Sequence, residues 1–192
     1  PNGYDEEDFP PQSPPQDPAF LIVHMGQLNP ERPVGILLDH LEAFFSMRPQ
    51  ARAACRVELI GPRYREDEIE VSRRGAEGSV RFIDALPHHE AIVRLLSARV
   101  LLLMEQESAR GALVLPGKVF EYLRAGRPIL GVLPRGEAWD LIAGLGAGRC
   151  ALPSDPRAGG AHLAGLFDAY QAGGPPPVAP DRGAVARFER RA

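Results

Sequence analysis

The chain of 192 residues is long enough for one sizeable domain or two small ones, and its 44% of hydrophobic residues is ordinary for a globular protein. Its formal net charge is only −3, and its lysines and arginines are dispersed, which disfavours nucleic-acid binding through a basic face. Two cysteines without metal-ligand spacing fit a reduced compartment, and no apolar run approaches the roughly 18 residues that span a bilayer.

Proline-rich tracts divide the chain into three parts. Residues 1–19 are rich in Pro, Gln and Asp and lack periodicity, which is typical of a linker. Residues 20–172 are expected to form the domain, and residues 173–192 hold a second proline tract followed by a helix that stops at the last residue. Both ends look cut, so we expect a fragment of a longer protein.

Within residues 20–172, short apolar runs alternate with segments of helical periodicity. The runs end at turn residues such as glycine, as buried parallel strands do. Strands are expected at 19–26, 55–61, 77–84, 99–104, 128–134 and 149–153, and helices at 30–47, 87–98, 136–146, 155–170 and between Gly117 and Gly126. This order predicts an α/β fold, a Rossmann-like three-layer domain with a parallel sheet of about six strands flanked by helices.

Ligands of such sheets bind outside the carboxyl ends of the strands. That rule selects four loops, which follow Gly26, Gly61 and Asp84 and run from Glu105 to Gly117.

The segment LPGKVFEYLRAGRPIL, residues 115–130, carries the strongest candidate chemistry. A helix that starts near Gly117 directs free N–H groups and partial positive charge toward the strand ends, and Lys118 adds a full charge, which favours a phosphate. Glu121 lies one turn further on the same face and is suited to accept hydrogen bonds from a sugar diol. The pattern indicates a nucleotide site, although an exposed Lys–Glu pair has the same spacing.

Other polar residues near the expected cleft have plainer interpretations. His88 and His89 begin a helix beside no carboxylate cluster and are interpreted as surface residues. His24, at a strand end, is interpreted as a packed histidine, with a sugar or phosphate contact as the alternative. Glu105 and Glu107 are expected to be solvated loop charges, with a contact to a bound sugar as the alternative.

Several segments together resemble the family 4-like glycosyltransferases. LPGKVFEYLRAGRPILGVLP is similar to the signature P-S/G-K-x-x-E-Y-x-A-x-G-x-P-I/V-L of one branch of that family. PNGYDEEDF resembles its interdomain segment, and VHMGQLNPERPVGILLDHLEAF resembles its first strand, glycine loop and helix. The resemblance extends from the linker to about residue 170 and is most specific from Pro116 to Pro128.

The resemblance implies the C-terminal, donor-binding half of a two-domain GT-B enzyme that works in bacterial-type polysaccharide biosynthesis. The parent would be a hexosyltransferase-type glycosyltransferase that transfers sugar, with retention, from a nucleotide diphosphate sugar to a glycan or lipid-linked acceptor. The acceptor would bind the missing N-terminal domain, so this fragment alone would be inactive. No cofactor or metal is expected, and the parent would be cytoplasmic, with peripheral association at the inner face of the membrane as a further option.

The resemblance also assigns roles to residues. Lys118 and Arg32 would be the catalytic groups that stabilise the departing diphosphate, and Glu121 would hold the ribose hydroxyls. The implied donor-binding set is Gly26, Gln27, Asp84, Ala85, Leu86, Gly117, Lys118, Glu121 and Gly136.

Three positions depart from the family pattern. Leu113 stands where the first glutamate of an E-x7-E motif is expected, Gln27 where an arginine often follows the glycine, and Asp84 where a glycine is usual. The alternatives are therefore a nucleotide-binding module without catalytic activity and a nucleotide-sugar epimerase of the same two-domain fold.

Overall fold

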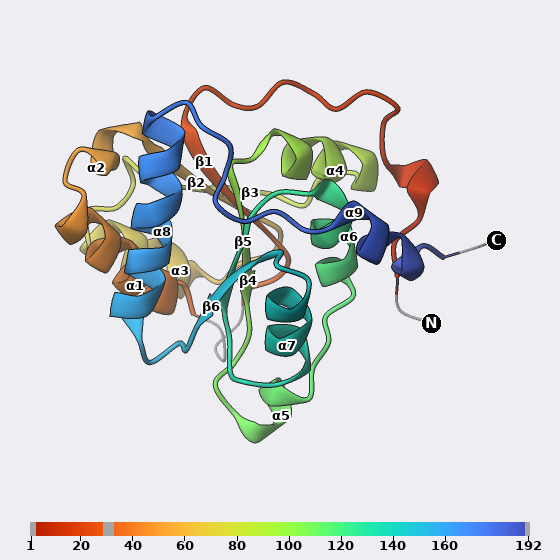
Figure 1. Ribbon diagram of the computed structural model, residues 1–192. Helices are drawn as coiled ribbons and strands as arrows, with labels where there is room; N and C mark the ends of the chain where they lie inside the picture. Colours follow the sequence, from red (N-terminus) through yellow and green to blue (C-terminus); the bar gives the residue numbers. More distant parts are fainter. Residues whose placement is uncertain (1–2, 29–32, 191–192) are drawn as a thin grey trace.

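Six parallel strands form the centre of the molecule, in the spatial order β3-β2-β1-β4-β5-β6 (Figure 1). The computed structural model describes residues 3–28 and 33–190. The strands are β1 (Phe20–Met25), β2 (Cys55–Ile60), β3 (Val80–Ile83), β4 (Val100–Met104), β5 (Ile129–Val132) and β6 (Gly148–Ala151). The strands β2 and β3 lie on one side of β1, whereas β4, β5 and β6 lie on the other. The order in which strands are added therefore reverses between β1 and β4. The predicted Rossmann-like α/β fold and its six strands are confirmed.

Helices cover both faces of the sheet (Figure 1). One layer holds α1 (Val34–Met47), α2 (Ala51–Ala54), α3 (Arg65–Arg73) and α8 (Pro156–Gln171). The other holds α4 (His88–Ser97), α6 (Lys118–Ala125), α7 (Glu137–Gly144) and α9 (Arg182–Val185), while α5 (Ala109–Ala112) lies in the loop after β4. The five helices expected within the domain are present, and α2, α3 and α5 are additional. None of the described helices is long and apolar enough to cross a membrane.

The period-two alternation of a strand sends successive side chains of β1 into two separate cores. Phe20 and Ile22 face α1 and α8, whereas Leu21 and Val23 face α4 and α6. The first core contains an aromatic cluster in which the Phe167 ring lies 5.3 Å from that of Phe20. Because both faces of the sheet are covered, the strands are apolar throughout rather than alternating.

The N-terminal segment is packed against the domain, which the composition of this stretch did not predict. Tyr4 and Phe9 are 3% and 7% exposed and belong to the second core, next to the short 3-10 helix η1 (Glu6–Asp8). The N–H of Tyr4 donates to the carbonyl of Phe188 at 3.1 Å, within a C-terminal 3-10 helix η2 (Ala186–Phe188). The described N-terminal and C-terminal segments therefore pack together beside α6 (Figure 1).

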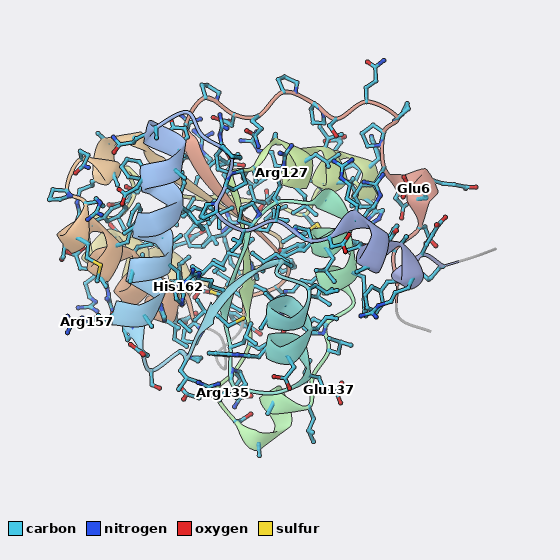
Figure 2. All side chains as sticks on the ribbon, in the orientation of Figure 1. Glu6, Arg127, Arg135, Glu137, Arg157 and His162 are labelled. Atoms are coloured by element: carbon cyan, nitrogen blue, oxygen red, sulfur yellow. The ribbon has the colours of Figure 1, made fainter. Side chains whose placement is uncertain are left out.

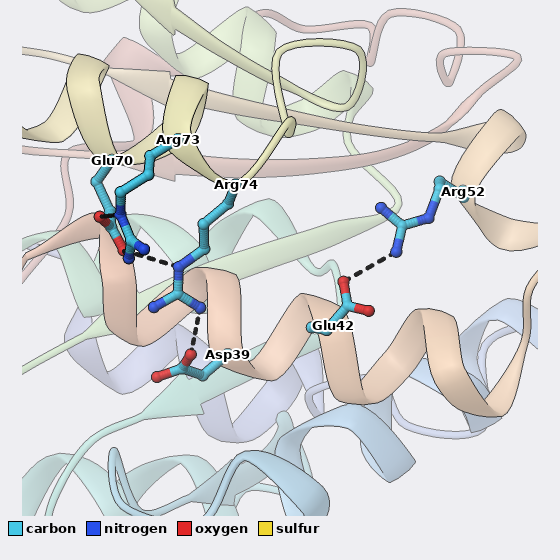
Figure 3. Close-up of polar contacts among 6 residues, drawn as sticks. All are labelled: Asp39, Glu42, Arg52, Glu70, Arg73 and Arg74. Carbon is cyan, nitrogen blue, oxygen red and sulfur yellow. Dashed lines mark hydrogen bonds and ion pairs between the residues drawn. The ribbon is translucent and has the colours of Figure 1, made fainter.

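Ion pairs on the surface link α1, α2 and α3 (Figure 3). Glu70 of α3 accepts hydrogen bonds from Arg73 and Arg74, which hold the pKa of its carboxyl group down at about 2. Arg74 also reaches Asp39 of α1 at 2.5 Å, and Arg52 of α2 reaches Glu42 at 2.9 Å. Because these pairs are exposed, each adds little to stability at ordinary ionic strength.

A buried carboxylate joins the starts of α1 and α3. Asp67 accepts hydrogen bonds at 3.1 Å from the backbone N–H of Val34, the first residue of α1, and from that of Tyr64, the N-cap of α3. Its negative charge also lies at the positive ends of two helix dipoles. A single residue of a polar helix thus orients α1 next to the loop that follows β1.

We expect Asp67→Ala to lower the free energy of unfolding by about 1–3 kcal/mol, because two N–H groups lose their acceptor. Glu66→Ala, at the exposed neighbouring position, should lower it by less than about 1 kcal/mol. Urea unfolding of both variants measures the difference, and equal effects would show that Asp67 is only a surface charge at a helix start.

Candidate functional site

Two glycine loops meet at the carboxyl edge, beside the point where the sheet reverses its strand order. Gly26 and Gly61 directly follow β1 and β2 and have φ angles of +140° and +133°. A side chain at Gly61 would place its Cβ 2.8 Å from the carbonyl oxygen of Gly26, so the two loops are in contact. Ligands of doubly wound sheets bind at such a reversal, next to the ends of β1 and β4.

A buried tyrosine fixes α6 against the end of β1. The N–H of Met25, the last residue of β1, donates to the Tyr122 hydroxyl at 2.8 Å, and the Tyr122 side chain is fully buried. This burial raises the pKa of Tyr122 well above its ordinary value, so the group stays a neutral hydroxyl. The bond fixes the position of α6 along the direction of β1, and so its position relative to the glycine loops.

The first turn of α6 consequently lies over Gly26. A Cβ placed on Gly26 would be 2.7 Å from Nζ of Lys118, so the lysine ammonium covers the glycine. Gly117 caps the helix without a side-chain hydrogen bond, and a Cβ built there meets nothing within 4 Å. The start of α6 is therefore open to an incoming group.

A cleft of about 410 Å³ opens at this place. It is lined by Gly3, Met25, Gly26, His88, Gly117, Lys118, Glu121 and Arg190. These residues come from both ends of the chain, from the end of β1 and from the starts of α4 and α6.

Glu121 lines the cleft as a mostly buried carboxylate. It therefore differs from the exposed Lys–Glu surface pair that has the same spacing. Its side chain is 15% exposed, and this burial raises the pKa of its carboxyl group. Nε2 of His88 lies 3.7 Å from Oε1 of Glu121 and 3.1 Å from Oδ2 of Asp8. His88 lowers the Glu121 pKa in part, and Asp8 raises it.

Of the donor-binding residues implied by the resemblance, four line this cleft, namely Gly26, Gly117, Lys118 and Glu121. Gln27 is exposed beside Gly26. Arg32, the second implied catalytic group, lies outside the described residues.

The remaining implied residues lie elsewhere on the carboxyl edge. Asp84 is 92% exposed and pairs with Arg63 at 2.7 Å, while Ala85 is exposed and Leu86 packs partly against the second core. A Cβ on Gly136 would lie 2.0 Å from the carbonyl oxygen of Ala112. The chain itself therefore requires a glycine at 136, independently of any ligand.

The histidine interpretations have different outcomes. His88 is a surface residue, as expected, with a side chain 50% exposed. The expectation that no carboxylates lie beside it is wrong, because Asp8 and Glu121 approach it from segments that are distant in sequence. His24 is a packed histidine, as expected: it is 1% exposed, and its Nδ1 lies 2.9 Å from the carbonyl oxygen of Leu102.

The loop after β4 also differs from expectation. Glu105 is 7% exposed rather than solvated, and the Glu107 carboxylate accepts hydrogen bonds from the backbone and hydroxyl of Ser154. Leu113 is 74% exposed at the position of the missing glutamate. Asp8 and Arg190 were missed, because nothing in their local sequence connects them to a site.

The described residues contain no group of three or more His, Cys, Asp or Glu side chains placed to hold a metal ion. The expectation that sugar transfer needs no metal or cofactor stays a prediction.

Comparisons with known proteins identify the fold. No family model matches the chain, and no curated protein matches it. It is similar to Anabaena HepE solved with UDP and glucose, with a TM-score of 0.60 and 19% identity over 80% of this chain and 40% of that one.

Two proteins of lipopolysaccharide synthesis are similar as well. The outer core galactosyltransferase WaaB, in its apo form, has a TM-score of 0.66 and 18% identity over 98% of this chain and 50% of its own. WaaG, a glycosyltransferase involved in lipopolysaccharide biosynthesis, has a TM-score of 0.61 and 16% identity over 90% and 42%. The chain thus spans half or less of the length of these proteins, and its α/β Rossmann-like fold matches that of GT-B glycosyltransferase domains.

Proposed function

We propose that this chain is the nucleotide-sugar-binding domain of a glycosyltransferase. The observation that carries the proposal is the cleft at the β1 end, where Lys118 covers Gly26 and the Glu121 carboxylate faces the same space. A diphosphate fits against the open first turn of α6, and the adjoining pentose fits against Glu121. The UDP in the HepE structure supports this assignment by analogy of fold.

The groups of the cleft suit one step of sugar transfer. When the bond between the sugar and the diphosphate breaks, negative charge develops on the departing diphosphate. The Lys118 ammonium and the N–H groups at the start of α6 are oriented before the reaction to stabilise that charge. Glu121 positions the donor and transfers no proton in this scheme.

The parent protein would carry out the complete reaction. We propose a retaining, hexosyltransferase-type enzyme of the family 4-like group that works in the cytoplasm without a metal, with Arg32 as a second cation. Its glycan or lipid-linked acceptor would bind a second domain, so the present chain alone should show no transfer. Lipid-linked acceptors would bring the parent to the inner face of the membrane.

The exposed Leu113 supports a second candidate, a nucleotide-binding module that does not transfer sugar. A glutamate there would face the donor sugar in the family pattern, whereas leucine offers no hydrogen bond. Incubation of the full-length parent with donor and glycan or lipid acceptors separates the candidates. Transfer supports the enzyme, binding alone supports the module, and an epimerised donor supports the epimerase.

We expect Lys118→Met and Glu121→Gln each to weaken UDP binding at least tenfold in calorimetry, through loss of a cation and of a diol acceptor. UDP at 100 times its dissociation constant should stabilise the wild type by roughly 2.7 kcal/mol in a thermal-shift screen, which also tests other nucleoside diphosphates. Arg157→Met, at an exposed position of α8 in the helix layer opposite to α6 (Figure 2), is the matched control. Unchanged affinity in both site variants would remove the assignment.

We expect Gly117→Ala to separate binding from folding. Gly117 has helical angles, φ −53° and ψ −38°, and a Cβ there meets no atom within 4 Å. The variant should fold with unchanged or slightly higher stability, by up to about 1 kcal/mol, yet bind UDP more weakly because the methyl group occupies the diphosphate position. Normal binding by a stable variant would place the diphosphate elsewhere.

We expect Glu121→Gln to become more stable relative to wild type as pH rises from about 4 to 7. Burial raises the folded-state pKa of Glu121 above 4.5, so its protonated form favours folding. That contribution is complete below the unfolded-state pKa and is lost as pH rises through the folded-state pKa, whereas glutamine does not titrate. Urea unfolding across this range measures the difference between the two proteins. A difference that stays constant with pH would contradict the burial argument.

A further inference from the structure

We propose that His88 and Asp8 position the Glu121 carboxylate, so that the pentose subsite of the proposed donor site extends into the N-terminal segment. This inference rests on the proposed function. It assigns roles to two residues outside the set that the family resemblance implies, and it extends the site beyond residues 20–172.

One ring nitrogen faces two carboxylates. Nε2 of His88 is 3.1 Å from Oδ2 of Asp8 and 3.7 Å from Oε1 of Glu121. Ionised carboxylate oxygens only accept hydrogen bonds, so this nitrogen must carry a proton to interact favourably with either. His88 is therefore a donor held between the N-terminal segment and α6.

Asp8 is held in place by contacts to α6 itself. Glu6, two residues earlier (Figure 2), forms a bidentate ion pair with Arg124, one turn after Glu121. The Arg124 guanidinium also lies 4.6 Å over the Phe9 ring. Residues on both sides of Asp8 are thus fixed to the helix that carries Glu121. His88, at the start of α4, contacts both Asp8 and Glu121.

Charged residues from both ends of the chain also surround this group. Arg190 pairs with Asp5 at 3.1 Å, and both contribute to the electrostatic environment of Glu121. Lys118 lines the same cleft. Within the described part of the chain, His88 forms an ion pair with Glu121 at 3.7 Å, so its loss should free the carboxylate to rotate.

The structural consequence concerns the sugar hydroxyls and not the phosphates. A carboxylate held in one orientation can accept hydrogen bonds from both hydroxyls of a cis-diol, whereas a rotating carboxylate must first be ordered. Removal of His88 should therefore reduce the preference for ribose over a sugar that lacks these hydroxyls. Binding of the diphosphate by Lys118 and α6 should be retained.

Calorimetry with UDP and 2′,3′-dideoxy-UDP tests this at one fixed pH. The wild type should prefer UDP. His88→Ala should reduce this preference by up to about fivefold, the range expected when a partly exposed ion-pair partner 3.7 Å away is lost, with little change for the dideoxy ligand. His88→Gln should restore part of the preference, because its amide can donate from a similar position. Asp8→Asn should reduce the preference less than His88→Ala does. His89→Gln is the matched control, since the adjacent His89 is 77% exposed and lies near Glu90 instead.

The outcomes separate this inference from the proposed function. If no nucleoside diphosphate binds the wild type, the proposed function and this inference both fail. If Glu121→Gln loses the ribose preference but His88→Ala and Asp8→Asn keep it, the donor site stands and the positioning role is overturned. Equal weakening of both ligands by His88→Ala also overturns it. If the alanine variant does not fold, the glutamine and asparagine variants decide the question.

Discussion

The hydrogen bond from the Met25 N–H to the Tyr122 hydroxyl holds the candidate site together. It joins the end of the central strand β1 to the middle of α6, and the Tyr122 side chain that accepts it is fully buried. Because an unpaired polar group there would be costly, the bond fixes how far α6 slides along the sheet. In this position of α6, Lys118 lies over Gly26 and Glu121 lines the cleft. The placement of both charges thus depends on the contact between Met25 and Tyr122.

The same region concentrates features that oppose folding. Gly26 and Gly61 adopt positive φ angles in touching loops, and Glu121 holds a carboxylate where burial disfavours its charged form. A hydrophobic residue at 121 would fill the same space without that penalty. Residues that lower the stability of the fold are retained where they are needed to bind a ligand. These features agree with a pocket for a ligand rich in hydroxyl groups and negative charge.

The sequence allowed prediction of the sheet but not of all that packs on it. Continuous apolar runs such as Leu101–Leu103 indicate strands that are buried on both faces of a sheet. Their alternation with helices leaves few possible topologies. Helix α3 was missed because only Asp67 and Val71 of its residues are buried, so its sequence carries little apolar periodicity. Asp8 and His88 are 80 positions apart, so no local spacing connects them, and the chain ends pack through contacts that composition does not reveal.

The glycines at the carboxyl edge of the sheet give different evidence about a ligand. At Gly61 and Gly136 an added Cβ would collide with a neighbouring backbone carbonyl, so packing of the chain alone accounts for both residues. At Gly117 the same Cβ meets nothing, and the backbone angles are ordinary helical ones. Folding therefore gives no reason for glycine at 117, where alanine would lower the entropy of the unfolded chain. A reason outside the fold is a group that approaches the start of α6 closely, and Lys118, the next residue, indicates that this group is negatively charged.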